Sequence, residues 1–120
     1  LLPGGNTWLD GPHQQVLDLA RRLLDARRPV AGICGATRAM ARAGLLERHA
    51  HVVDADADEP DYPGSASRVH ASVAHDGALV TAIGEAPLEF NRAVFTLLDL
   101  DDAAGIDAWY ASFKSVPDAR

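Results

Sequence analysis

The stretch that decides the fold is Pro29-Val30-Ala31-Gly32-Ile33-Cys34-Gly35-Ala36-Thr37, in which a short apolar run meets a helix-compatible segment. This order is typical of a strand, a sharp turn and a helix, with a nucleophile at the turn. The turn needs small neighbours because its backbone is strained, and Gly32 and Gly35 meet that need. It would also place the Cys34 sulfur at a helix N-terminus, where backbone N–H groups and the helix dipole favour a thiolate. The sequence therefore predicts a reactive, solvent-reachable thiol, and the alternative interpretation is a small buried hydrophobic residue at a strand end.

The composition narrows the class of protein. The chain has 120 residues, which indicates one domain over residues 1–120, and its 48% hydrophobic and 23% charged content is that of a soluble globular protein. A net charge of −6 argues against nucleic-acid and anionic-membrane partners. No apolar run approaches the roughly 20 residues of a membrane span. The single cysteine forms no internal disulfide, so we expect a reducing, cytoplasmic setting.

The first residues have the pattern of a strand that is already ending. Leu1-Leu2 is apolar, Pro3-Gly4-Gly5 is a turn signal, and no initiator methionine precedes them. A fold that began in the middle of a strand would leave an unpaired remnant of sheet. We therefore expect that residues upstream of Leu1 are missing and that the domain is N-terminally incomplete.

Hydrophobic periodicity and turn residues divide the rest of the chain into helices and strands. The predicted helices begin near Pro12, at Gly35, near Pro87 and after an Asp102 N-cap. The predicted strands are Val30–Ile33, Ala50–Val53, Arg68–Ala74 and Ala78–Ala82, with a hairpin turn at His75-Asp76-Gly77. This alternation implies βαβ units, a mostly parallel sheet and an α/β fold.

In such a fold the reactive groups gather at the C-terminal ends of the strands, so Pro3-Gly4-Gly5 and Cys34 would share one edge. A thiolate that attacks a carbonyl needs donors aimed at the developing negative charge, and glycines let backbone N–H groups approach closely. Gly5, at the end of one strand, and Gly35, directly after the nucleophile, are the candidate pair of oxyanion donors.

Two further patterns carry less information. The acidic segment from Asp54 to Pro63 has Glu59 where a calcium loop needs glycine and Ser65 where it needs glutamate, so we predict an exposed, solvated loop. His49 and His51 have the spacing of a metal pair on one strand face, but no third ligand is spaced nearby. The sequence therefore predicts no metal site.

Three motifs in this order resemble those of the DJ/PfpI superfamily. They are Leu2-Pro3-Gly4-Gly5, Ala31-Gly32-Ile33-Cys34-Gly35-Ala36 and Leu79-Val80-Thr81-Ala82-x-Gly84-x-Ala86-Pro87-Leu88-Glu89-Phe90. The elbow is most similar to that of the bacterial glutamine amidotransferase-like (class I) branch. The resemblance covers nearly all of the chain and implies a flavodoxin-like three-layer sandwich, often a homodimer. It also implies that roughly two N-terminal βα units are missing, together with the acidic residue that normally contacts the cysteine.

The chain departs from the superfamily's peptidase-like branch directly after the cysteine. That branch has a histidine there as the base, whereas this chain has Gly35, so we do not expect proteolysis by that mechanism. The His-x-Glu arrangement of glutamine amidotransferases is also absent, which leaves the general base unassigned. His51, in a predicted strand, and Arg38, one turn past Cys34, are candidates to support the thiol. A packing histidine and a solvated arginine are the simpler interpretations of these two residues.

From the resemblance we expect a cysteine-dependent hydrolase or transferase that needs no cofactor. Cys34 would add to a small substrate with a carbonyl, amide or nitrile-like carbon. Two alternatives stay open at this point. One is an oxidation- or carbonyl-stress-responsive thiol protein without turnover. The other is a non-catalytic interaction domain, which a missing N-terminal portion would favour.

Overall fold

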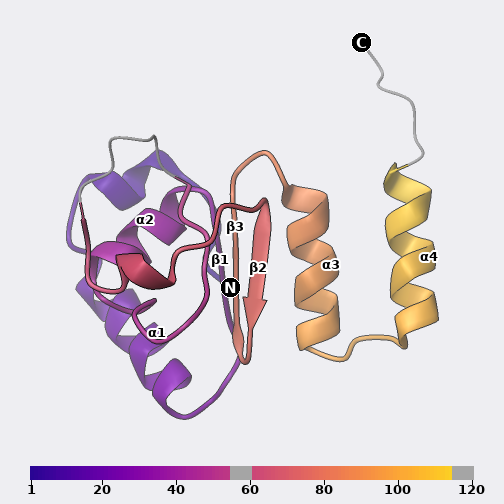
Figure 1. The fold of residues 1–120 in the computed structure, drawn as a ribbon, viewed down its shortest axis with the longest axis horizontal. Coiled ribbons are helices and arrows are strands. Elements are labelled where there is room, and N and C mark those ends of the chain that lie inside the picture. Colours follow the sequence, from indigo (N-terminus) through magenta and orange to yellow (C-terminus); the bar gives the residue numbers. More distant parts are fainter. Residues whose placement is uncertain (55–60, 115–120) are drawn as a thin grey trace.

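The computed structural model describes residues 1–54 and 61–114, which form a mixed α/β fold around a small sheet (Figure 1). The elements in chain order are the 3₁₀ helix η1 (Asn6–Leu9), α1 (Gln14–Asp25), β1 (Val30–Ile33), α2 (Gly35–Arg42), the 3₁₀ helix η2 (Ser65–Ser67), β2 (Val73–Asp76), β3 (Leu79–Ala82), α3 (Pro87–Leu97) and α4 (Ala103–Lys114). None of the helices in these two ranges is long and apolar enough to cross a membrane.

The sheet in the described ranges has the strand order β1-β3-β2. β1 and β3 are parallel, with Val30 opposite Leu79, whereas β2 runs antiparallel to β3. Leu2 adds a parallel bridge to Gly32 on the other side of β1. The predicted α/β fold with a mostly parallel sheet is therefore confirmed, and β2 is its antiparallel member.

Hydrophobic residues cover both faces of the sheet because successive side chains of a strand point to opposite faces. Val30 and Leu79 belong to one buried cluster with residues of α1 and α2. Ala31 and Val80 belong to a second cluster, which Phe90 of α3 completes. Figure 1 shows α1 and α2 on one side of the sheet and α3 on the other, in three layers as predicted.

β2 and β3 form the predicted hairpin, but its boundaries differ from the expectation. β2 begins at Val73 instead of Arg68 and continues through Asp76, so the turn consists of residues 77–78. Gly77 opens this turn with φ 58°, a left-handed conformation that glycine adopts without steric cost.

The predicted strand Ala50–Val53 is wrong. In this segment only His51 pairs, in an isolated parallel bridge with Arg68. The Val52 N–H donates to the side-chain hydroxyl of Thr81 at 2.9 Å instead of to a neighbouring strand. Val52 and Val53 are buried as in a strand. The Thr81 hydroxyl accepts the hydrogen bond from Val52 that a neighbouring strand would otherwise accept.

The first long helix also begins later than predicted, at Gln14 instead of near Pro12. The 3₁₀ helix η1 precedes it, and His13 at the N-cap position has a left-handed backbone with φ 45°. The His13 ring contacts the Thr7 carbonyl oxygen at 2.5 Å. The segment from Pro3 to His13 is therefore compact, with local contacts between residues five and six positions apart before α1 begins.

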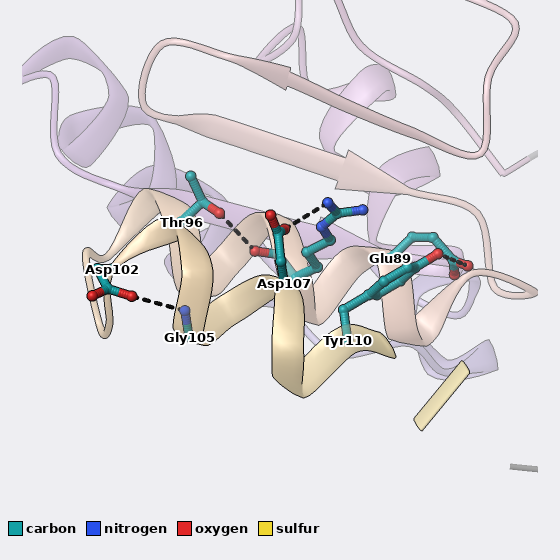
Figure 2. Close-up of polar contacts among 7 residues, drawn as sticks. Glu89, Thr96, Asp102, Gly105, Asp107 and Tyr110 are labelled. Atoms are coloured by element: carbon teal, nitrogen blue, oxygen red, sulfur yellow. Dashed lines mark hydrogen bonds and ion pairs between the residues drawn. The ribbon is translucent and has the colours of Figure 1, made fainter. Parts of the chain in front are cut away.

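α4 packs against α3 and lies on the far side of α3 from the sheet (Figure 1). The predicted Asp102 N-cap is confirmed, because its Oδ1 accepts a hydrogen bond from the Gly105 N–H at 2.8 Å (Figure 2). The Trp109 ring meets Phe95 of α3 edge-on, with 4.7 Å between ring centroids. The aromatic residues of α4 thus pack between two helices, while Phe113 is mostly exposed.

Polar side chains join the same two helices on their outer surface. The Tyr110 hydroxyl donates to Glu89, as Figure 2 shows, and this bond is 3.1 Å long. The Arg92 guanidinium pairs with Asp107 at 2.8 Å. Lys114 also donates to Glu89, and this bond lowers the pKa of the Glu89 carboxyl and raises the pKa of the Lys114 amine.

Candidate active site around Cys34

Cys34 occupies the sharp turn between β1 and α2, as the sequence predicted. Its backbone has φ 59° and ψ −130°, a conformation that costs a residue with a side chain on the order of 1–3 kcal/mol. Backbone hydrogen bonds on both sides of the residue hold it there. The Cys34 N–H donates to the carbonyl oxygen of Ala82 at 3.0 Å, and the Cys34 carbonyl accepts from the Thr37 N–H at 3.0 Å. Such an elbow lifts the nucleophile above the end of the sheet.

Small residues are needed around the elbow because other parts of the chain come very close. A Cβ atom on Gly4 would lie 2.8 Å from the Cβ of Cys34, and one on Gly35 would lie 2.5 Å from the carbonyl oxygen of Gly5. One on Gly32 would lie 2.6 Å from the sulfur of Met40. The Pro3-Gly4-Gly5 turn and the elbow therefore share one edge of the sheet and touch through glycine backbone.

A cavity of about 230 Å³ opens at this edge. Its lining residues are Gly5, Asn6, Leu9, Cys34, Gly35, Arg38 and Asp54. The structure therefore brings together the proposed nucleophile, both proposed oxyanion glycines and the proposed supporting arginine. Cys34 is partly exposed within this cavity, which is the setting expected of a reachable thiol.

His51, the fifth candidate from the sequence, is engaged elsewhere. Its side chain is fully buried, with Nε2 at 2.7 Å from the Tyr62 hydroxyl and Nδ1 at 2.7 Å from the His49 carbonyl oxygen. Burial lowers the pKa of His51, so the neutral ring is favoured. His51 is absent from the lining of the Cys34 cavity, and these contacts describe a packing histidine.

Asp54 is the site residue that sequence reasoning missed. It was expected in the exposed acidic loop, but it is half-buried and its Oδ2 accepts a hydrogen bond from the Gly84 N–H at 2.7 Å. Residues 55–60 of that loop lie outside the described residues. The signal that could have found Asp54 is its place directly after the buried pair Val52-Val53, because the end of a buried run is where edge groups are expected.

Thr37 connects the elbow to the Asp54 segment. Its fully buried hydroxyl donates to the Cys34 carbonyl oxygen at 2.6 Å and accepts from the Asp54 N–H at 2.8 Å. One side chain thus fixes the distance between the turn that carries the thiol and the backbone that carries the carboxylate.

This geometry agrees with a match to known proteins. The DJ-1/PfpI family profile matches residues 1–97. The chain belongs to the DJ-1/PfpI family. The matched region contains the elbow, the glycine turn, the β2–β3 hairpin and the helices α1, α2 and α3. It ends before α4.

Two relatives from Bacillus subtilis (strain 168) show the same relationship. The chain is 36% identical over 120 residues to the protein named "Uncharacterized protease YoaZ" and 32% identical over 107 residues to "Uncharacterized protease YdeA". These matches cover 96% and 87% of this chain, but only 57% and 54% of the relatives.

Solved structures of the DJ-1/PfpI family have the same fold. A thiJ/pfpI family protein from Bacillus anthracis is 35% identical with a TM-score of 0.86, over 95% of this chain and 56% of that one. The superfamily protein Atu0886 from Agrobacterium tumefaciens is 32% identical with a TM-score of 0.73, over 92% and 62%. The chain therefore spans little more than half the length of the relatives that it matches.

Proposed function

We propose that this protein is a cysteine-dependent hydrolase or transferase that acts on a small carbonyl, amide or nitrile-like substrate through Cys34. One observation carries the proposal: the elbow thiol opens into a cavity whose walls include the backbone of Gly5 and Gly35. A thiol beside closely approaching backbone is the arrangement that nucleophilic acyl chemistry requires.

In the proposed reaction the Cys34 sulfur attacks the electrophilic carbon, and negative charge develops on the substrate oxygen or nitrogen. The N–H groups of Gly5 and Gly35 would donate to that atom. Donors of this kind are worth on the order of 10²–10³ in kcat each. Arg38, on the cavity wall, would hold an anionic part of the substrate.

A small substrate is proposed because the cavity is small and because a peptidase base is missing. A volume of about 230 Å³ lies below the size of pockets that enclose drug-sized ligands. Both Bacillus subtilis relatives have "protease" in their names, but this chain has Gly35 where the peptidase-like branch has its histidine. We therefore do not extend proteolysis to this chain.

The second candidate function is an oxidation- or carbonyl-stress-responsive thiol protein. Partial exposure of Cys34 at the N-terminus of α2 favours it, because accessible thiolates oxidise readily to sulfenic and sulfinic acids. The two candidates share the reactive thiol and differ in turnover.

The test is turnover of 4-nitrophenyl acetate, 4-nitroacetanilide, glutamine and simple α-oxoaldehydes by the wild type and by Cys34→Ala. Thr96→Ala, at an exposed position on α3, serves as the control for handling and folding. Loss of turnover in Cys34→Ala alone supports the enzyme. Peroxide-dependent mass gain on Cys34 without any turnover supports the sensor.

Alkylation of Cys34 by iodoacetamide separates both candidates from a non-catalytic interaction domain. The folded protein should react faster than the same chain in denaturant, where Cys34 is an ordinary thiol. A folded-state rate no higher than the denatured-state rate contradicts both reactive-thiol functions.

A further inference from the structure

Two hydrogen bonds hold Asp54 in place, one at its carboxylate and one at its main chain. The carboxylate oxygen Oδ2 accepts from the Gly84 N–H at 2.7 Å, and the backbone N–H of Asp54 donates to the Thr37 side-chain hydroxyl at 2.8 Å. In residues 1–54 and 61–114, no hydrogen bond to the other carboxylate oxygen, Oδ1, is present. Asp54 is thus an anchored carboxylate on the wall of the Cys34 cavity.

Gly84 shows how close this carboxylate lies to the thiol. A Cβ atom on Gly84 would lie 3.0 Å from Asp54 Oδ2 and 3.0 Å from Cys34 Sγ. The two atoms therefore flank the same point, and their separation is at most twice that distance. Direct contact or a single bridging water spans such a gap, which is the reach that general acid–base catalysis requires.

We propose that Asp54 is the acid–base residue of the Cys34 site, which takes the thiol proton and returns it to the leaving group. This inference rests on the proposed function. It fills the role of base that neither Gly35 nor His51 provides, since Gly35 has no side chain and both His51 ring nitrogens have other partners.

An amide substrate would react in two stages, acylation of Cys34 and hydrolysis of the resulting thioester. Asp54 takes the Cys34 proton while the sulfur electron pair bonds to the acyl carbon and the carbonyl pair moves onto oxygen. The C=O bond then re-forms, the C–N bond breaks, and Asp54 gives the proton to the departing amine, which leaves a thioester on Cys34. Water attacks that thioester, passes a proton to Asp54, and the sulfur recovers this proton as the C–S bond breaks.

The charged groups around Asp54 suit this role. Arg38 of α2 lies on the same cavity wall, where its positive charge offsets the negative charge of the carboxylate. Asp54 also lines a second cavity of about 480 Å³ together with Arg68, His70 and Glu85. Asp54 is therefore a lining residue of both cavities.

Asp54→Asn is the decisive variant because asparagine keeps a side-chain oxygen for the Gly84 N–H and removes only the charge and the proton-accepting ability. Asp76→Asn is the matched control. Asp76 also accepts a backbone N–H through Oδ2, from Ala50 at 2.7 Å, but it lies on β2 away from the Cys34 cavity.

Two substrates with the same acyl group separate proton transfer from positioning. 4-Nitroacetanilide releases an amine that must be protonated, whereas 4-nitrophenyl acetate releases a phenolate that leaves without a proton. In Asp54→Asn, kcat/KM for the anilide should fall about 10²-fold and that for the ester by less than about tenfold. An equal loss for both substrates, or no loss, overturns the proposal.

A second readout does not need turnover. Removal of a carboxylate within a few ångströms of the sulfur should raise the rate of Cys34 alkylation by anionic iodoacetate relative to neutral iodoacetamide. The expected change is about fourfold in Asp54→Asn and none in Asp76→Asn. An unchanged ratio in Asp54→Asn overturns the proposed proximity.

These results distinguish the failure of the inference from that of the proposed function. If the wild type shows no turnover that depends on Cys34, the enzyme function fails and the acid–base role fails with it. If turnover depends on Cys34 but Asp54→Asn affects the anilide and the ester alike, only the inference fails.

Discussion

The elbow around Cys34 and the α3–α4 pair are held together in opposite ways. At the elbow, backbone groups and one buried hydroxyl make the hydrogen bonds, and glycines allow the chain to approach itself closely. Between α3 and α4, exposed side chains make the polar contacts, and the side chains of Arg92 and Asp107 are 43% and 62% exposed. We expect the elbow to tolerate added salt but no added side-chain volume. The contacts between α3 and α4 should tolerate added volume but weaken with salt and with changes in pH.

We expect the largest loss of stability from a single methyl group added at the elbow. Gly35→Ala would place a Cβ 2.5 Å from the Gly5 carbonyl oxygen, so the turn must move or the helix must shift. We expect a loss of about 3 kcal/mol in the free energy of unfolding, measured by urea denaturation, and slower alkylation of Cys34. Gly11→Ala is the control, because nothing lies within 4 Å of a Cβ there. Equal stability of the two variants would show that the close approach is dispensable.

A smaller loss is expected from removing a single buried hydroxyl. Thr37→Val keeps the shape of the side chain but leaves the Cys34 carbonyl and the Asp54 N–H without this partner. We expect about 2 kcal/mol of destabilisation, by the same denaturation measurement. Thr96→Val on α3 is the matched control, since its hydroxyl bonds Arg92 O at 3.0 Å on an exposed surface (Figure 2). A comparable effect at both threonines contradicts the distinction between the two regions.

The pH dependence of the free energy of unfolding should come partly from the buried histidine His51. Burial lowers the pKa of His51 in the folded state, so the unfolded state binds the proton more readily. The stability contributed by the neutral ring is therefore fully present above the unfolded pKa of about 6.5 and declines as the pH falls below it. His51→Gln should flatten this part of the stability–pH curve, and His75→Gln, at an exposed position, should not.

The smallest effect is expected at the outer surface of α4. Lys114 lowers the pKa of Glu89, so their pairing is fully present above the ordinary glutamate pKa and is lost as the pH falls through the lowered value. Glu89→Gln should raise amide hydrogen exchange in α4 a few-fold at neutral pH, and 1 M salt should do the same to the wild type. Exchange in β1 and β3 should not change. Protection of α4 that withstands both treatments would mean that the aromatic contacts hold the helix.

Local signals made the elbow predictable from sequence. The apolar run, the small residues and the helix-compatible segment are adjacent in the chain, and together they specify β1, the turn at Cys34 and α2. The Asp102 N-cap and the Asp76-Gly77 hairpin are local in the same sense. Only the ends of these elements shifted, because fraying and turn geometry decide them.

The rest of the site depends on contacts between distant segments, which a sequence pattern does not reveal. Asp54 lies on the wall of the Cys34 cavity, where Gly84, thirty residues further on, anchors its carboxylate. Ala50–Val53 looked like a strand because it is apolar, but the Thr81 hydroxyl replaced the missing ladder. The spacing of the aromatic residues in α4 did not predict that this helix packs on α3. The same spacing is compatible with a protein core and with a dimer interface.

The pairing of β1 with β3 determines when the elbow that carries Cys34 can form during synthesis. Val30 pairs with Leu79, about fifty residues later, and the Cys34 N–H is bound by Ala82. Contacts of such long range form late because the intervening loop must first be closed. On the ribosome, the Cys34 N–H therefore lacks its Ala82 partner until β3 has emerged, and the elbow is complete only when the hairpin docks.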